Sequence, residues 1–204
     1  MTHPPHKVSA LSRVVSMNEE IKRVIETAFR VNVMALNAIL LARRAGVVAR
    51  GFGVLSNELR EFVHQLEASM RRLQDLTADT VTAVSEDARR RRLQRTLQVT
   101  AAELAGKSAG RASIMDTVLA AQNRWTEARR DRLGALNQSL LLSLSDADQL
   151  AQFGAVLART AKIEAAYGGD FAGSLTEVAS EFGNTIQKIL TSLETLMRHN
   201  RERA

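Results

Sequence analysis

The sequence predicts an all-α protein, an elongated antiparallel four-helix bundle or coiled coil made of helical hairpins. Only two of its 204 residues are prolines, Pro4 and Pro5, so the residue that most strongly interrupts helices is absent from the rest of the chain. Aromatic residues make up 4% of the chain, and no short alternating runs of β-branched and aromatic residues indicate strands. Hydrophobic residues make up 45%, enough to bury a continuous core.

Apolar residues recur at steps of three and four, the spacing that lines one face of a helix. One such seam consists of Phe52, Leu55, Leu59, Phe62, Leu66, Met70 and Leu73, and a second of Phe171, Leu175, Val178, Phe182, Ile186, Ile189, Leu193 and Leu196. The second seam is close to a heptad repeat, with one extra residue where it shifts phase. Both seams need partner helices to cover them.

Glycines divide this helical pattern. They cluster in residues 46–53, 106–110 and 168–173, and a helical chain that reversed at all three places would form four antiparallel helices. We expect a flexible N-terminus at residues 1–8 and a single helical-bundle domain at 9–204, with a first hairpin at about 9–105 (tip 46–51) and a second at about 111–203 (tip 167–171).

Two signals for the start of a helix lie inside the long central segments. Ser85, Glu86 and Asp87 form one, and Ser145 with Asp148 forms the other. Either signal would break a central helix in two, so the sequence predicts four to six helices.

The chain contains no cysteine, which excludes disulfides and thiolate metal sites and favours a cytoplasmic location. No stretch approaches the roughly 18 uninterrupted apolar residues of a membrane span. The longest candidate, residues 31–42, contains Asn32 and Asn37 and is followed by Arg43 and Arg44. We therefore expect no membrane span.

The formal net charge is +6, and the densest basic cluster consists of Arg89, Arg90, Arg91 and Arg92. Consecutive helical arginines spread around the helix instead of forming one stripe. Two interpretations stay open: a solvated helix surface, or a contact with phosphate or an acidic protein. Few aromatic residues lie nearby to stack on bases, so nucleic acid is not expected as a partner.

No catalytic constellation is present. The four histidines lack helical ligand spacing, and neither HExxH nor GxSxG occurs. We expect no enzyme activity, no metal and no cofactor. Trp125 and Tyr167, each the only residue of its kind, are assigned to core packing or a helix interface.

Residues 27–66 carry a specific resemblance. They read TAFRVNVMALNAILLARRAGVVARGFGVLSNELREFVHQL, which resembles the cytoplasmic signalling hairpin of methyl-accepting chemotaxis proteins. The matching positions are Ala28, Asn32, Ala35, Leu36, Asn37, Ala38, Ala42, Arg44, Ala45, Gly46, Arg50, Gly51, Phe52, Val54, Glu58 and Arg60. Polar and glycine positions match as well as apolar ones, so the pattern is not merely that of an amphipathic helix.

The resemblance implies a helical hairpin that turns at Gly46 and Gly51, with Phe52 closing the apolar interior beneath the turn. It also implies that the outer surface of the tip binds partners. The expected partner-binding residues are Phe29, Leu36, Asn37, Leu40, Leu41, Arg44, Val47, Val48 and Val54. Leu41 stands where the family has a glutamate, and Val47, Val48 and Ala49 replace its turn residues Glu-x-Gly. This tip is more apolar than that of a kinase-controlling receptor, which puts kinase control in doubt.

A fainter second copy of the motif begins at Lys162 and reads KIEAAYGGDFAGSLTEVASEF, with turn residues Gly168, Gly169 and Phe171. A chance match between two alanine-rich helices is the alternative. If the copy is real, both tips lie at the same end, and one chain imitates a receptor dimer. The chain would then be a monomeric pseudo-dimer; otherwise it would form an ordinary homodimer.

The sequence therefore predicts a chemoreceptor-like cytoplasmic signal-transduction or scaffold protein that acts through contacts at its hairpin tips. The expected partners are a second copy, other chemoreceptor hairpins, or a histidine kinase and its coupling protein. The alternatives are a structural helical bundle without kinase control and a basic helical protein that binds nucleic acid or anionic lipid.

Overall fold

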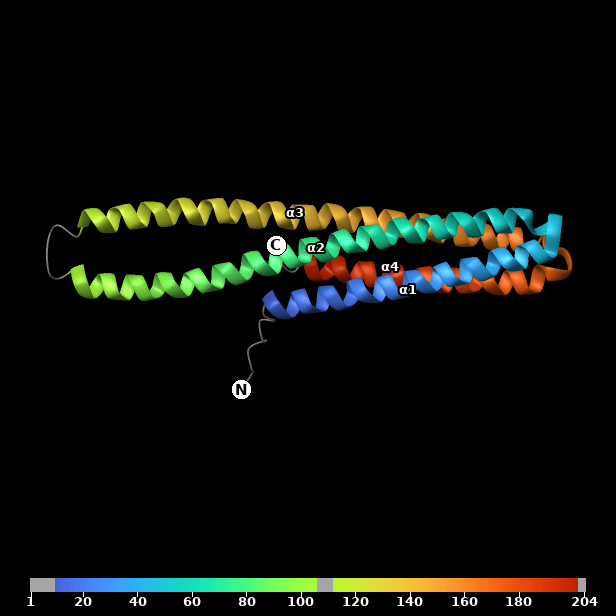
Figure 1. Ribbon diagram of the computed structural model, residues 1–204, viewed down its shortest axis with the longest axis horizontal. Coiled ribbons are helices and arrows are strands. Elements are labelled where there is room, and N and C mark those ends of the chain that lie inside the picture. Colours follow the sequence, from blue (N-terminus) through green and yellow to red (C-terminus); the bar gives the residue numbers. More distant parts are fainter. Residues whose placement is uncertain (1–9, 106–111, 202–204) are drawn as a thin grey trace, which may run out of the picture. The chain divides into compact units, whose positions relative to one another are not determined.

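The computed structural model describes residues 10–105 and 112–201, and these form long α-helices without a strand among them (Figure 1). The elements are α1 (Ala10–Ala45), α2 (Arg50–Ala105), α3 (Ala112–Ala165) and α4 (Ala172–Arg201), with two short 3-10 helices, η1 (Gly46–Ala49) and η3 (Gly169–Phe171). The all-α prediction is confirmed. The predicted flexible terminus, residues 1–8, lies outside the described residues.

The two predicted interruptions of the central helices do not occur. α2 continues through Asp87, and α3 continues through Asp148. Asp87 accepts an ion pair from Arg91 Nε at 3.0 Å, and Asp148 Oδ2 accepts a hydrogen bond from Gln152 Nε2 at 2.7 Å. Both carboxylates therefore bind side chains one turn further along the same helix instead of capping a new one.

The chain divides into two compact units. Of the described residues, the four-helix unit contains 10–75 and 140–201, and the two-helix unit contains 76–105 and 112–139. α2 and α3 contribute to both units, whereas α1 and α4 lie entirely in the four-helix unit.

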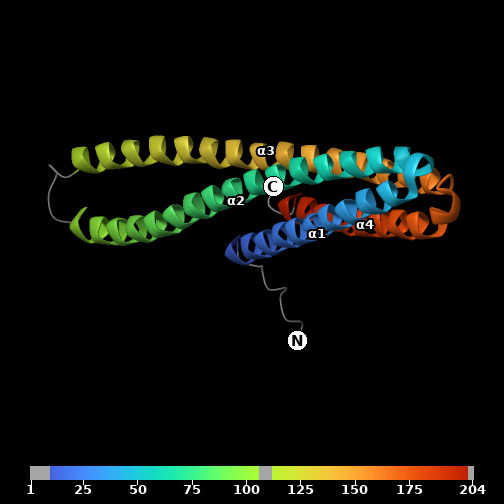
Figure 2. The ribbon, with the colours of Figure 1, turned by 45° about the vertical axis from the view of Figure 1, so that its right-hand side comes forward.

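The four-helix unit is an antiparallel bundle of hairpins, as the sequence predicts (Figures 1 and 2). α1 packs along α4, where Thr185 Oγ1 lies 4.0 Å from Met34 Sδ. α1 also contacts α2, because Arg60 Nε donates a hydrogen bond to Asn32 Oδ1 at 3.2 Å. Each helix thereby buries one apolar face against its neighbours.

The core-facing seam of α4 is a regular heptad. Its buried apolar residues are Leu175, Ala179, Phe182, Ile186, Ile189, Leu193 and Leu196. The predicted phase shift is wrong, because the small Ala179 faces the core and the larger Val178 beside it is only half-buried. With Ala179 in the seam, the steps alternate between four and three without an extra residue.

α2 differs from its predicted seam in the same way. Ser56 is buried, while Leu55 is half-buried. The Ser56 hydroxyl donates a hydrogen bond of 2.8 Å to the carbonyl oxygen of Phe52. This bond satisfies the buried hydroxyl within its own helix, which lets a polar residue occupy a core position.

The described stretch Val14–Leu93 contains an 18-residue window with a mean hydropathy of 1.5, apolar enough by length and composition to cross a membrane. Of that window, 33% is buried in the structure. The core helix of a soluble helical bundle can be equally long and apolar, so one such window is weak evidence for a membrane span.

Candidate functional site

The first hairpin turn joins α1 to α2 through η1. Gly46 adopts a φ of 76°, in the left-handed region that residues with a side chain rarely occupy. Ala49 and Phe52 are fully buried directly after it. Phe52 thus closes the core beneath the turn, as the resemblance implies.

The second turn joins α3 to α4 through η3. α3 ends in hydrogen bonds from the amides of Ala166, Tyr167 and Gly168 to carbonyls three residues earlier, at 3.1 to 3.2 Å. Gly169 has a φ of 59°. Phe171 is only half-buried, so its packing differs from that of Phe52, its counterpart in the first copy.

Both turns lie at the same end of the four-helix unit (Figure 1). A Cβ at Gly169 would lie 3.8 Å from Val48 Cγ2, so the two turns are in contact. Near them, the Glu164 carboxylate of α3 lies directly against Gly51 of α2, where a Cβ would collide with it. The two hairpins are therefore packed together at their tips.

The burial pattern of α1 recurs in α3. The buried residues Met17, Ile21, Val24, Ala28, Val31, Ala35, Ala38 and Ala42 correspond, at one constant offset, to Leu140, Leu144, Ala147, Ala151, Gly154, Ala158, Ala161 and Ala165, all of them buried. The offset is the one that aligns the two sequence copies before their turns. The repeat therefore includes the buried core positions as well as the motif residues. This favours two related hairpins and argues against a chance match between alanine-rich segments.

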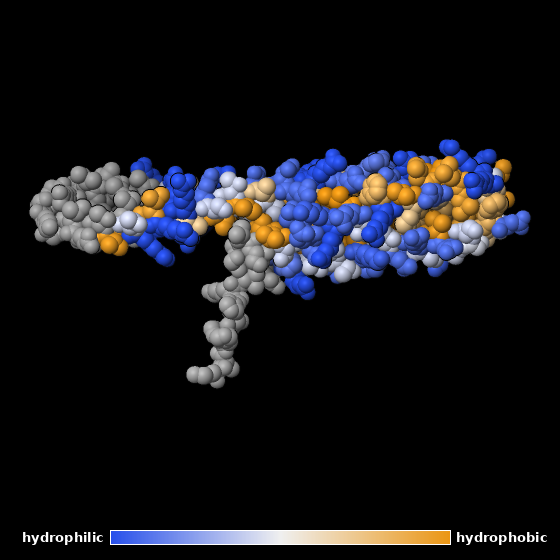
Figure 3. Space-filling view, turned by 60° about the horizontal axis from the view of Figure 1, so that its bottom comes forward, coloured by the Kyte–Doolittle hydropathy of each residue, from blue (hydrophilic) through white to orange (hydrophobic). Residues whose placement is uncertain are grey.

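Apolar side chains gather on the outside of this end, where orange surface is extensive in Figure 3. The predicted partner-binding residues Phe29, Leu36, Asn37, Leu40, Arg44, Val47, Val48 and Val54 are all exposed. Val47 is the most exposed of the large apolar side chains, at 76%. Leu41 is half-buried, so it is the least accessible of the predicted set.

The second hairpin adds exposed residues that the sequence interpretation did not nominate: Phe153, Val156, Ile163 and Tyr167. Tyr167 is 72% exposed, so its assignment to core packing or a helix interface is wrong for this chain. The repeat itself contained the signal that would have found two of these residues, Ile163 and Tyr167. At the offset between the two copies, Ile163 is the counterpart of Leu40, and Tyr167 is the counterpart of Arg44.

The four arginines of the predicted anion contact lie in the two-helix unit and have different surroundings. Arg89 and Arg90 line a pocket with Trp125. Arg91 pairs with Asp87, and Arg92 is exposed. All four arginines are exposed, which fits the solvated helix surface, although Arg90 also stacks on Trp125.

Among the described residues, no group of three or more His, Cys, Asp or Glu side chains is placed to hold a metal ion. Exposed apolar side chains of the four-helix unit surround the hairpin turns, with Val47 and Val48 at the first and Tyr167 at the second.

No protein-family model matches the chain. Among curated proteins, it is similar to methyl-accepting chemotaxis protein McpG of Pseudomonas putida, with 27% identity over 86 residues, which are 42% of this chain and 14% of that protein. It is also similar to methyl-accepting chemotaxis protein PctB of Pseudomonas aeruginosa, with 23% identity over 146 residues, 70% of this chain and 23% of that protein. A third relative is methyl-accepting chemotaxis protein IV of Escherichia coli, with 31% identity over 87 residues, 42% of this chain and 16% of that protein.

The chain thus spans less than a quarter of the length of each of these curated relatives. The helical-hairpin fold is compatible with this similarity. The chain is distantly similar to part of the methyl-accepting chemotaxis proteins, which supports a signalling domain like theirs.

Proposed function

We propose that this chain is a non-enzymatic, cytoplasmic signal-transduction or scaffold protein of the chemoreceptor type, which acts through protein contacts at its paired hairpin turns. The observation that carries the proposal is the apolar surface around the turns. Val47 and Val48 are exposed at the first turn; at the second, Ile163 is exposed at the end of α3 and Tyr167 in the turn that follows it. Exposed apolar clusters of this kind mark contact surfaces.

Burial of apolar area supplies the driving force for such a contact. Burying two large apolar side chains is worth about 3 to 6 kcal/mol before the costs of association. Because this term does not depend on charge, added salt should not weaken it. A contact through exposed arginines such as Arg44 would instead lose affinity as salt is added.

The partner in this proposal is a hairpin tip of the same kind, in a second copy of the chain or in another chemoreceptor. Support comes from the relatives, which are chemotaxis proteins by name, and from the chain's own two tips, which already pack against each other. A histidine kinase or coupling protein fits less well, because Leu41 and Val47 replace glutamates of the family's tip.

The test introduces charge at the tip. Val47→Glu combined with Leu40→Glu should weaken association with itself or with a purified chemoreceptor signalling hairpin at least tenfold, about 1.4 kcal/mol. Both positions are exposed, so helix content and melting temperature should stay unchanged. Sedimentation velocity measures self-association, and titration calorimetry measures binding to the receptor hairpin.

Val15→Glu is the control, because Val15 is an exposed residue of α1 far from the turn, with an exposed fraction of 55% close to the 53% of Leu40. Equal loss of binding in the control and the tip variant would contradict the proposal. If the wild type binds a kinase or coupling protein and the tip variant does not, the tip is the contact surface, but its partner is not another hairpin tip. Association that salt disrupts and the tip variant does not affect would point to the basic surface instead.

A further inference from the structure

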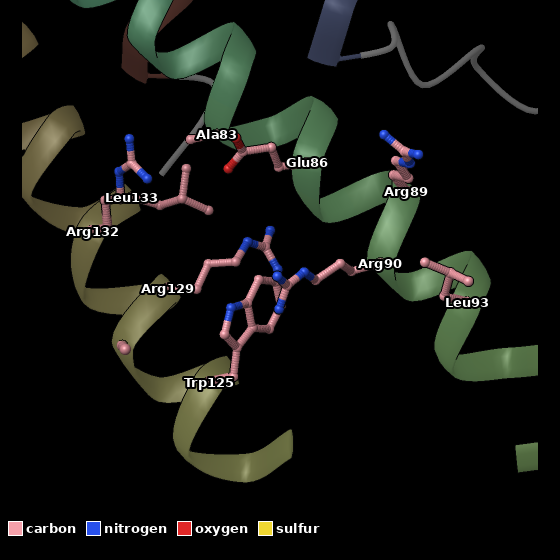
Figure 4. A pocket seen from close by; sticks show the side chains of 10 residues that line it. Ala83, Glu86, Arg89, Arg90, Leu93, Trp125, Arg129, Arg132 and Leu133 are labelled. Atoms are coloured by element: carbon pink, nitrogen blue, oxygen red, sulfur yellow. The ribbon is translucent and has the colours of Figure 1, made fainter. Parts of the chain in front are cut away.

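The two-helix unit contains a pocket of about 590 Å³ between α2 and α3 (Figure 4). Its lining combines guanidinium groups with apolar side chains. The arginines are Arg89, Arg90, Arg129 and Arg132, and the apolar residues include Ala83, Leu93, Trp125 and Leu133. Glu86 is the one acidic residue of the lining. The pocket belongs to neither hairpin turn, and its function is independent of the tip proposal.

The centre of the pocket is held in place by its own contacts. The guanidinium carbons of Arg90 and Arg129 lie 4.5 and 5.5 Å from the centroid of the Trp125 ring, within the range of cation–π attraction. Arg129 Nη1 also contacts Asp87 Oδ1, and Asp87 accepts a second ion pair from Arg91. A site with such fixed side chains loses little conformational entropy when a ligand binds.

One hydrogen-bond donor of Arg129 has no partner in this arrangement. Its Nε is buried and has no hydrogen-bond acceptor. Burial lowers the pKa of the Arg129 guanidinium below its usual value, although an arginine stays charged at neutral pH. A buried N–H donor without an acceptor costs free energy, and the neighbouring carboxylate, Asp87, pairs with Arg129 through Nη1 instead.

Charge and shape together indicate the class of ligand. Four arginines against Glu86 of the lining and Asp87, the partner of Arg129, leave an excess of positive charge that favours an anion. Leu93, which is 56% exposed, and Trp125 favour an apolar group beside that anion. The pocket is also far larger than a single carboxylate or phosphate needs. Two antiparallel helices leave a groove that a third helix can fill.

We propose that this pocket is the docking site for an acidic amphipathic helix of a partner protein, which places carboxylates near Arg89, Arg129 and Arg132 and an apolar side chain near Leu93 and Trp125. Nucleic acid fits less well, because two arginines already stack on the ring of Trp125, the one aromatic side chain of the lining, and leave it unavailable to a base. A second copy of this basic unit would bring like charges together.

Trp125 is the only tryptophan of the chain, so its fluorescence reports on the pocket directly. The probe is a tryptophan-free peptide of about three heptads with leucine at the a and d positions and glutamate at the exposed positions. Titrated into the full chain, it should change Trp125 fluorescence saturably, and calorimetry should give the same affinity. Added salt should weaken binding, and the same peptide with lysine in place of glutamate should not bind.

The double variant Arg89→Gln, Arg132→Gln should weaken peptide binding at least tenfold. Arg92→Gln is the matched control, because Arg92 belongs to the same arginine run but does not line the pocket. The affinity of the Arg92→Gln protein for the peptide should stay within twofold of the wild-type value. Equal losses in the two proteins would overturn the proposal, as would the absence of saturable binding by both methods. Binding of a single-stranded oligonucleotide or inorganic phosphate without binding of the peptide would overturn it in favour of a phosphate site.

Discussion

Gly154 shows how closely two helices of the four-helix unit approach. A Cβ at this position would lie 2.6 to 2.9 Å from three atoms of the Phe62 ring, and Phe62 is itself buried in the core. Cores are packed too densely for a ring to move aside freely. The missing side chain of Gly154 is therefore what lets α3 accept the Phe62 ring of α2.

We expect Gly154→Ala to destabilise the protein. Overpacking a core costs about 1 to 3 kcal/mol, more than the up to about 1 kcal/mol that alanine gains over glycine inside a helix. Gly183→Ala is the control, because a Cβ there meets nothing within 4 Å and only the helix gain remains. Urea denaturation should separate the two variants by about 1 to 3 kcal/mol. Equal stabilities would mean that Phe62 rotates away without cost.

In the arginine cluster, residues of the same type have different surroundings. Arg90, Arg91 and Arg92 are consecutive, chemically identical and all exposed, yet Arg90 stacks on Trp125 and Arg91 pairs with Asp87. A helix turns each successive side chain by about 100°, so neighbours in sequence face different surroundings. Composition could identify the basic cluster, but the partner of each arginine depends on the facing helix.

At the scale of elements, the glycines mark where helices end. α1 ends one residue before Gly46, and η3 begins at Gly169, and these are the two residues with positive φ among the described residues. Other glycines lie inside helices, Gly134 and Gly183 among them. Glycine clusters therefore predicted the turns, whereas isolated glycines had no effect on helix continuity.

Gly46→Ala should destabilise the first turn through the backbone alone. A Cβ at Gly46 meets nothing within 4 Å, so the cost comes from its φ of 76°, about 1 to 2 kcal/mol for a left-handed residue with a side chain. Gly53→Ala is the comparison, since Gly53 is helical and its Cβ would lie at an ordinary 3.5 Å from Ala42 Cβ. Guanidinium denaturation should show Gly46→Ala below the wild type and Gly53→Ala at or above it. A Gly46→Ala protein as stable as the wild type would show that the turn has another conformation.

At the scale of the molecule, the four-helix unit has the number of helices that two receptor hairpins supply, and here they come from one chain. The recurring burial of α1 and α3 and the contact between the turns support an internal pseudo-dimer. An ordinary homodimer could instead pair α1 of one chain with α4 of another. The two arrangements differ in which chain provides the neighbouring helix.

Paired cysteines distinguish them, and the chain has no cysteine of its own. Met34→Cys combined with Thr185→Cys places thiols where the native side chains lie 4.0 Å apart. A short thiol cross-linker at low protein concentration should join them within one chain, detected by mass spectrometry of the proteolysed monomer. Gln187→Cys in place of Thr185→Cys is the control, because Gln187 faces outward on α4. Cross-links found solely between chains would establish the homodimer.

The sequence by itself determined the helical class, the places where the chain reverses and the resemblance of residues 27–66 to a chemoreceptor hairpin. These depend on local properties: apolar period, proline and glycine positions, and a motif of matched residues. The tertiary structure decided which of two adjacent residues enters the core, Ala179 or Val178 and Ser56 or Leu55. It also decided which residues of the second hairpin lie exposed at the tip, and it brought Trp125 to the arginines of α2. The reason is physical: period and propensity act along one helix, whereas burial and side-chain pairing depend on the helix that packs opposite.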